Sequence, residues 1–315
     1  MKRKVILMGG KTYVISLPAS WIRKYDIQKG QELELEVLDH EIRVTTDTVP
    51  KLHILKLDLG KASQSILVKK ITTAYQLGYE ELTLSFPKKI ENTKDGKKAK
   101  TINIIEETCD QLIGFEVIKQ SDTSCFIKDV AGRDINEFMN VLRRTFLMLN
   151  SFGQNSLTGI KEKDVKSLNE LHRKHISIRK FISYCQRYLN LRGLGKRTVL
   201  YHELVMGLLE ISRTYRFLCK VQAEQKNDYS KDVLNVLEDT IRLQEEFYKL
   251  FFKHSVENTQ LIIAARMKII HQINDLSSKV NGPDLILLHR IPNIQNTLYS
   301  LLSVTTAIHF EDTNS

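Results

Sequence analysis

Long hydrophobic runs are missing from this sequence of 315 residues. No stretch reaches the eighteen consecutive apolar residues that indicate a membrane-spanning helix. The apolar residues that follow the first lysines end at Met8, before Gly9-Gly10, which is too short for the apolar region of a signal peptide. We therefore expect a cytoplasmic protein that does not insert into a membrane.

Cysteines are few and widely spaced, at Cys109, Cys125, Cys185 and Cys219. No two of them have the short spacing of a zinc-binding pair, and the chain does not have the dense cysteines of a small disulfide scaffold. We expect four reduced thiols that are mostly buried and act as small apolar side chains.

Motifs of known enzyme classes are also lacking. The sequence contains no nucleophile motif, no glycine-rich phosphate loop, and no dense cluster of acids and histidines. Gly60 and Gly132 lack the flanking residues of a nucleotide-binding loop. We therefore expect that the protein is not an enzyme.

Positive charge is abundant and unevenly distributed. The chain has 47 Lys and Arg against 37 Asp and Glu, a formal net charge of +10. In the first thirty residues seven basic residues oppose Asp26 alone, whereas residues 31–47 contain six acids and only Arg43 as a base. Within the first 47 residues the positive field is thus confined to the first thirty, which favours a polyanionic partner such as nucleic acid.

Two hairpins are predicted at the N-terminus. Strands over 4–8 and 13–17 flank Gly9-Gly10, a pair that tolerates positive φ. Pro18 ends the second strand and begins a short helix over 19–25. Strict alternation over 32–37, a turn at 39–41 and a strand over 42–45 make the second hairpin. Such short elements bury too little apolar area alone, so we expect a homodimer that shares one core.

The N-terminal motifs resemble a known family. They are Gly9-Gly10 before an alternating strand, Leu17-Pro18, Trp21, Ile27, Lys29-Gly30 and the alternating strand that follows. Together they resemble the AbrB/SpoVT/MazE swapped-hairpin domain over about residues 1–48. The resemblance implies an interlocked dimer that grips double-stranded DNA with basic residues around the first strand and the glycine loop.

Candidate DNA-binding residues follow from that resemblance. Phosphate oxygens accept hydrogen bonds from Lys and Arg, and these contacts dominate affinity for DNA. The candidates for backbone contacts are Lys2, Arg3, Lys4 and Lys11, with Thr12 and Ser16 as polar candidates and Arg23 and Lys24 ranked lower. The alternative is a small domain that only dimerises.

Residues 49–133 predict a small α/β segment. A strand over 52–59, a helix over 63–77 and a strand over 81–86 indicate a βαβ crossover. We predict a polar loop over 88–100, a helix over 101–112, and strands over 115–119 and 124–128.

Residues 134–315 predict an all-α domain with long 3.6-residue periodicity. The predicted helices cover 134–154, 161–190, 198–226, 230–253, 256–280 and 284–310. They are separated at Gly153, Gly193-Leu194-Gly195, Asn227-Asp228 and Gly282-Pro283. One apolar stripe comprises Tyr201, Leu204, Leu208, Ile211, Tyr215 and Leu218, and another comprises Ile262, Ala265, Ile269, Ile273, Leu276 and Val280. Six helices predict two three-helix bundles.

The whole arrangement is similar to archaeal PhoU-like regulators, in which an AbrB-type domain precedes a PhoU helical domain. The motifs are Tyr75-Gln76-Leu77-Gly78-Tyr79 with Glu81, Leu112-Ile113-Gly114-Phe115-Glu116, Arg143-Arg144, and Leu209-Glu210-Ile211. The resemblance implies a DNA-binding transcriptional regulator linked to phosphate uptake or signalling. The alternative is an adaptor that binds a phosphate transporter or a kinase.

Metal ligands are sparse in the helical domain. PhoU domains typically carry two acids four residues apart on one helix face, but Glu210 is followed at that distance by Thr214, and 300–306 contain no carboxylate. We therefore expect no metal cofactor; Glu203 and Glu210 are the weak candidates for a divalent ion. His172, His175 and His202 are alternatives for zinc. Residues 161–220 contain fourteen bases against five acids. This basic segment could bind phosphate, nucleic acid or an acidic partner domain; the alternative is a solvated basic face that binds no ligand.

Overall fold

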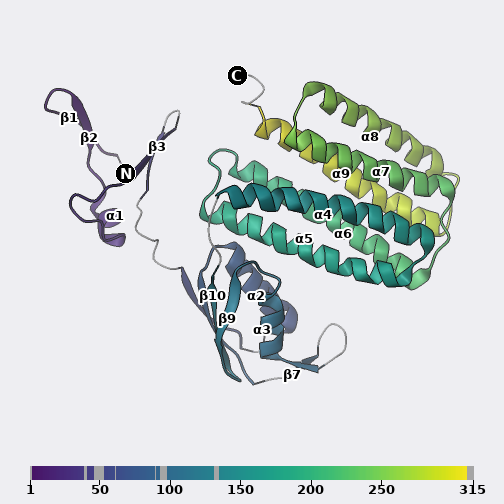
Figure 1. Cartoon of the computed structure of the whole chain (residues 1–315), viewed down its shortest axis with the longest axis horizontal. Coiled ribbons are helices and arrows are strands. Elements are labelled where there is room, and N and C mark those ends of the chain that lie inside the picture. The colour runs from purple at the N-terminus through teal and green to yellow at the C-terminus, as the bar shows by residue number, and fades with distance from the viewer. Residues whose placement is uncertain are drawn as a thin grey trace. The chain divides into compact units, whose positions relative to one another are not determined.

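The protein divides into two compact units, residues 1–54 and 55–315. The computed structural model (Figure 1) describes residues 2–38, 41–45, 53–60, 62–88, 90–92, 98–130 and 135–310. It has the predicted fold class: a small N-terminal β domain, then a mixed α/β sheet and an all-helical region. The predicted domain boundaries at 48/49 and 133/134 lie outside the described residues.

Unit 1 contains both predicted hairpins. Strand β1 (Val5–Met8) pairs antiparallel with β2 (Thr12–Ile15), and β3 (Glu34–Leu38) pairs with β4 (Glu41–Thr45). Gly9 and Gly10 turn the first hairpin with φ of +61° and +76°, which glycine adopts without steric cost. Helix α1 (Ala19–Lys24) begins directly after Pro18, whose carbonyl accepts from Trp21 and Ile22. Part of the turn predicted at 39–41 lies outside the described residues.

The second segment is a four-stranded sheet covered by two helices. Its strand order is β5 (Ile54–Asp58), β6 (Glu81–Ser85), β10 (Ser124–Asp129) and β9 (Phe115–Gln120). Helix α2 (Gln64–Gln76) joins β5 to β6, and Leu59 N–H donates to the Ser85 carbonyl at 2.8 Å. The ends of both strands therefore meet, as a β–α–β crossover requires. Helix α3 (Thr101–Cys109) shares the sheet's core with α2.

The prediction of a polar loop over 88–100 is wrong in part. Strands β7 (Ile90–Asn92) and β8 (Lys98–Lys100) form an antiparallel hairpin there. Lysine-rich sequence has low strand propensity, but backbone hydrogen bonds between the two short strands do not depend on the side chains. Residues 93–97 lie outside the described part of the chain.

Six helices occupy residues 135–310 and run side by side (Figure 1). They are α4 (Ile135–Glu162), α5 (Val165–Leu191), α6 (Thr198–Gln225), α7 (Lys231–Phe252), α8 (Val256–Ser277) and α9 (Pro283–Ile308). Side chains of Asp164, Ser230 and Ser255 accept backbone N–H groups at the starts of α5, α7 and α8, where such groups lack helical partners. Among the described residues, no helix has the length and apolar character needed to cross a membrane.

The predicted break at Gly153 is wrong. Helix α4 continues through this position to Glu162, and the chain turns at Lys163, where φ is +53°. A Cβ on Gly153 would lie 3.0 Å from the Tyr215 hydroxyl of α6. The glycine thus allows close helix packing rather than ending the helix. The other three predicted breaks fall between helices.

One continuous apolar core joins all six helices. Within it α4, α5 and α6 contact one another, as do α7, α8 and α9, while α4–α7 and α6–α9 contacts unite the two groups. Every member of the predicted α6 stripe is buried. In the α8 stripe only Ile262 and Ile269 are buried, because α8 lies at the edge of the bundle (Figure 1).

All four cysteines are free and buried, as predicted. Burial raises the pKa of the Cys109 and Cys125 thiols to about 12 and that of Cys219 to about 11. These thiols stay protonated at neutral pH and are therefore poor nucleophiles.

Arg187 on α5 connects the sheet to the helices. Its guanidinium lies 2.6 Å from the Asp129 carboxylate, and both side chains are only 5% exposed. The same group donates to the carbonyl oxygens of Tyr75 and Tyr79 at 2.6 and 2.8 Å and lies 4.8 Å from the Tyr75 ring centroid. Sheet and bundle are thus held together by a buried cation that donates to one carboxylate and two carbonyl oxygens.

Candidate nucleic-acid interface

The predicted DNA-contacting cations lie at the two ends of strand β1. Lys2, Arg3 and Lys4 lead into the strand, and Lys11 lies in the turn after it; all four are exposed. Within the described residues none of them forms an ion pair. Their charges are therefore available to a ligand in solvent, and β1 fixes the separation between the two groups.

The other four candidates lie farther along unit 1. Thr12 is exposed and pairs with Met8 across the hairpin, and Ser16 is exposed just after β2. Arg23 Nε donates to the Ala19 carbonyl at 3.3 Å, and Lys24 Nζ lies 5.2 Å from the Tyr25 ring centroid. Both cations on α1 already have a contact within the helix or its cap, which favours the N-terminal cations as the principal phosphate contacts.

Apolar side chains on the strands of unit 1 are uncovered. Val5, Tyr13, Val37 and Ile42 are between 66% and 77% exposed. Wherever the structure describes the side chain, residues of unit 1 up to 53 are exposed or half-buried. Two-stranded hairpins are marginal in water without a further apolar surface to pack against. Unit 1 therefore needs another surface to complete its core.

The weak metal candidates are not brought together. Glu210 pairs with Arg213 at 3.0 Å on the helix surface, and Glu203 is exposed. His175 is buried on α5, with Nδ1 2.9 Å from the Ser212 hydroxyl, whereas His202 is half-buried on α6. The side chain of His172 is outside the described set. Among the described residues, no three His, Cys, Asp or Glu side chains are placed to hold a metal ion.

Several cations of 161–220 serve the contact between sheet and helices. Arg187 binds Asp129, Arg179 donates to Gln111, and Lys180 Nζ donates to the Asp110 carbonyl at 2.6 Å. These three side chains point to the α/β segment rather than to solvent alone. The net charge of residues 161–220 therefore overstates the positive surface that a ligand would meet.

One feature of the helical region was not predicted. A groove of about 790 Å³ lies between α7 and α8 and is lined by apolar side chains and by charged side chains of both signs. A signal was present in the sequence, because α8 carries Leu261, Ile263 and Met267 outside its predicted apolar stripe. Apolar residues on several faces of an edge helix indicate an uncovered surface.

The comparison with protein families agrees with the N-terminal geometry. A family described as "Antidote-toxin recognition MazE, bacterial antitoxin" matches residues 6–51, which include α1, the second hairpin and all of the first hairpin except Val5. Comparisons with curated proteins and with solved structures found no match. The chain therefore carries a MazE/AbrB-type domain at its N-terminus, followed by a mixed sheet and a largely helical region.

Proposed function

We propose that the protein is a homodimeric, DNA-binding transcriptional regulator. The observation that carries the proposal is the combination in unit 1 of exposed cations at both ends of β1 with uncovered apolar strands. A second copy would cover the strands, and pairing would present two sets of cations to one duplex. The family match over residues 6–51 supports DNA binding and pairing by unit 1; Lys11 lies within the matched range, whereas Lys2, Arg3 and Lys4 precede it.

The four N-terminal cations provide the first test. In a variant with Lys2, Arg3, Lys4 and Lys11 changed to Ala, we expect duplex DNA affinity to fall and to depend less on salt. A dimer loses eight cations, which flattens the slope of log K against log salt by up to about 7 if each contacts a phosphate. Fluorescence anisotropy from 50 to 300 mM salt would measure both quantities.

A matched control removes the same charge elsewhere. Lys69, Lys70, Lys231 and Lys279 are exposed and lie outside unit 1, so their joint change to Ala should leave the salt slope nearly unchanged. Equal DNA affinity of the parent and the N-terminal variant at every salt concentration would refute the proposed interface.

We further propose that the regulated genes serve phosphate uptake or signalling. Support comes from the resemblance of the helical region to PhoU-like regulators, and we assign this region to sensing or partner docking rather than to catalysis. Transcripts from a strain without the gene, compared with the parent strain under phosphate excess and starvation, would test the link. Phosphate-responsive transcripts that are identical in both strains would exclude it.

The competing function is an adaptor whose N-terminal unit only dimerises. Unit 2 contains its own apolar cores, which would allow it to dock a transporter or kinase without DNA. Complementation with the four-cation variant separates the two functions. Restored phosphate-responsive transcription would favour the adaptor, and failure to restore it would favour the DNA-binding regulator.

A further inference from the structure

The groove between α7 and α8 has the size of a small-molecule site. Its volume is about 790 Å³, within the range of roughly 300–1,000 Å³ that is usual for ligand pockets. Lining residues on α7 extend from Asp239 to Leu250, about 16 Å along the helix axis at 1.5 Å per residue, and Lys253 follows just after the helix. The lining is therefore elongated along α7, which suits an extended ligand.

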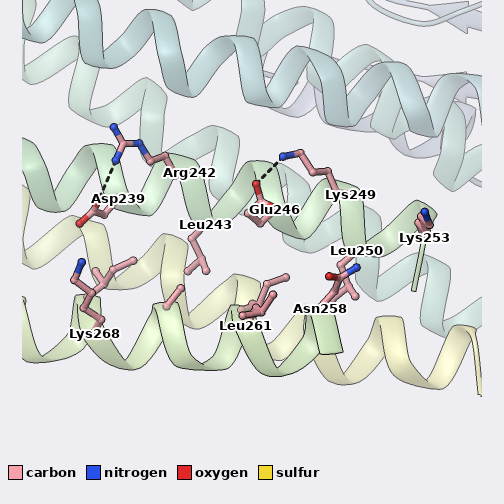
Figure 2. A pocket seen from close by; sticks show the side chains of 13 residues that line it. Asp239, Arg242, Leu243, Glu246, Lys249, Leu250, Lys253, Asn258, Leu261 and Lys268 are labelled. Atoms are coloured by element: carbon pink, nitrogen blue, oxygen red, sulfur yellow. Dashed lines mark hydrogen bonds and ion pairs between the residues drawn. The ribbon is translucent and has the colours of Figure 1, made fainter. Parts of the chain in front are cut away.

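The groove has an apolar floor that the protein leaves partly uncovered. Figure 2 shows Leu243 of α7 and Leu261 of α8 directed toward the space between the two helices. Leu261 is 67% exposed and Ala265 is also exposed, whereas Ile262 and Ile269 are buried beneath them. An apolar chain in the groove would remove this surface from water, which stabilises binding in proportion to the area covered.

The charges at the rim favour an anion. Two acids line the groove, but Arg242 pairs with Asp239 at 3.6 Å and Lys249 pairs with Glu246 at 2.6 Å. Lys253 and Lys268 also line it, and within the described residues neither has an acidic partner. They lie toward opposite ends of the groove in Figure 2. An acidic group at either end would therefore meet an uncompensated lysine.

We propose that the α7–α8 groove binds an amphiphilic anion, an extended acyl chain that carries one carboxylate. The chain would cover the exposed Leu261 and Ala265 above the buried Leu243, and the carboxylate would pair with Lys268 or Lys253. This inference goes beyond the proposed DNA-binding function. It is tested without DNA, so its failure would leave that function untouched.

The apolar part of the site is tested with two neighbouring alanines. Decanoate, below its micellar concentration, would be titrated into the full-length protein by isothermal titration calorimetry. Ala265→Trp fills the groove and should weaken binding by about tenfold or more, a loss of at least about 1.4 kcal/mol. Ala264→Trp is the matched control, because Ala264 is exposed on the same helix and does not line the groove. Its affinity should equal that of the parent.

The charged part of the site is tested with a neutral ligand. Lys268→Glu combined with Lys253→Glu should weaken decanoate binding severalfold and leave 1-decanol binding unchanged. Lys231→Glu, an exposed change at the start of α7 outside the groove, should alter neither. No binding of decanoate to the parent would overturn the proposal. The proposal would also be overturned if Ala265→Trp bound decanoate as tightly as Ala264→Trp. It would likewise be overturned if the Lys253→Glu, Lys268→Glu double variant bound decanoate as tightly as Lys231→Glu.

Discussion

At the scale of a residue, Arg187 is a buried charge whose acceptors are all supplied by the sheet and its flanking segments. Its guanidinium binds the Asp129 carboxylate and two carbonyl oxygens. In Arg187→Met these acceptors lose their donor, and Asp129 becomes a buried charge without its cation. We expect the free energy of unfolding to fall by about 3–5 kcal/mol, measured by urea denaturation.

An exposed ion pair supplies the comparison for Arg187. Arg213 and Glu210 are both more than half exposed, so Arg213→Met should cost at most about 1 kcal/mol. Adding Asp129→Leu to Arg187→Met should restore part of the lost stability, because the unpaired charge is removed. Equal losses from Arg187→Met and Arg213→Met would contradict the role of Arg187 in joining sheet and bundle.

His254 should make the stability of the helical region depend on pH. It follows α7, and its ring stacks on His309 with centroids 5.4 Å apart. Both of its ring nitrogens are buried and have no hydrogen-bond partner among the residues that the structure describes. Burial, with His309 nearby, lowers the pKa of His254 below its usual value of about 6.5. As the pH falls through 6.5, the unfolded state takes up a proton before the folded state does.

The stability that neutral His254 contributes is therefore complete above about pH 6.5 and is lost as the pH falls toward its lower folded-state pKa. Urea midpoints between pH 7.5 and 5 should decline more steeply for the parent than for His254→Phe. His289→Phe, an exposed histidine on α9, should retain the parent's slope. Identical slopes for the parent and His254→Phe would disprove this linkage.

At the scale of the element, the hairpins of unit 1 expose the surface that a second copy would cover. Val37 on β3 is 77% exposed in a strand whose apolar residues alternate with acids. Val37→Asp would place a charge in the shared core and should shift the dimer toward monomer. Sedimentation velocity over a range of concentrations would measure the change.

Ile66→Asp is the matched control for Val37→Asp. Ile66 is 48% exposed in the first turn of α2, where an acid is compatible with the helix dipole. Its sedimentation should match that of the parent. A Val37→Asp protein that stays fully dimeric would rule out the β3–β4 hairpin as the dimer surface.

Local patterns predicted most elements, and tertiary contacts explain the misses. Alternation, proline and glycine turns correctly indicated both hairpins of unit 1, and helical periodicity identified the buried α6 stripe. The break predicted at Gly153 was wrong because the low helix propensity of glycine is outweighed by close packing on Tyr215. Ala265 belongs to a predicted apolar stripe but is exposed, because periodicity indicates which residues share a face and not whether another helix covers that face.

The candidate site was predictable only in part. The sequence predicts that Lys2, Arg3, Lys4 and Lys11 flank one strand. In the structure all four side chains are exposed at the ends of β1. The contacts of Arg187 join positions 58 and 112 residues apart, which no local pattern could reveal. The α7–α8 groove likewise depends on how two helices are spaced, a property that the sequence of either helix does not contain.

At the scale of the whole molecule, the two units should differ in how they fold. Residues 55–315 contain two apolar cores, whereas the described side chains of unit 1 up to residue 53 include none that is buried. A protein truncated to residues 55–315 should remain folded, with a thermal midpoint that does not depend on concentration. Calorimetry and circular dichroism at several concentrations would test this expectation.

Residues 1–54 alone should behave in the opposite way. Their β-sheet signal should appear only at concentrations where two copies associate, because folding and pairing would share one core. A monomeric 1–54 fragment that is folded at high dilution would contradict this view of unit 1.

The uncovered strands of unit 1 also have a consequence for gene dosage, if unit 1 pairs and binds DNA as proposed. Folding and pairing would then be one bimolecular event, so at low concentration the amount of folded dimer would grow with the square of the number of chains synthesised. Halving expression would cut promoter occupancy about fourfold in that regime, which would make regulation steeply dependent on expression level.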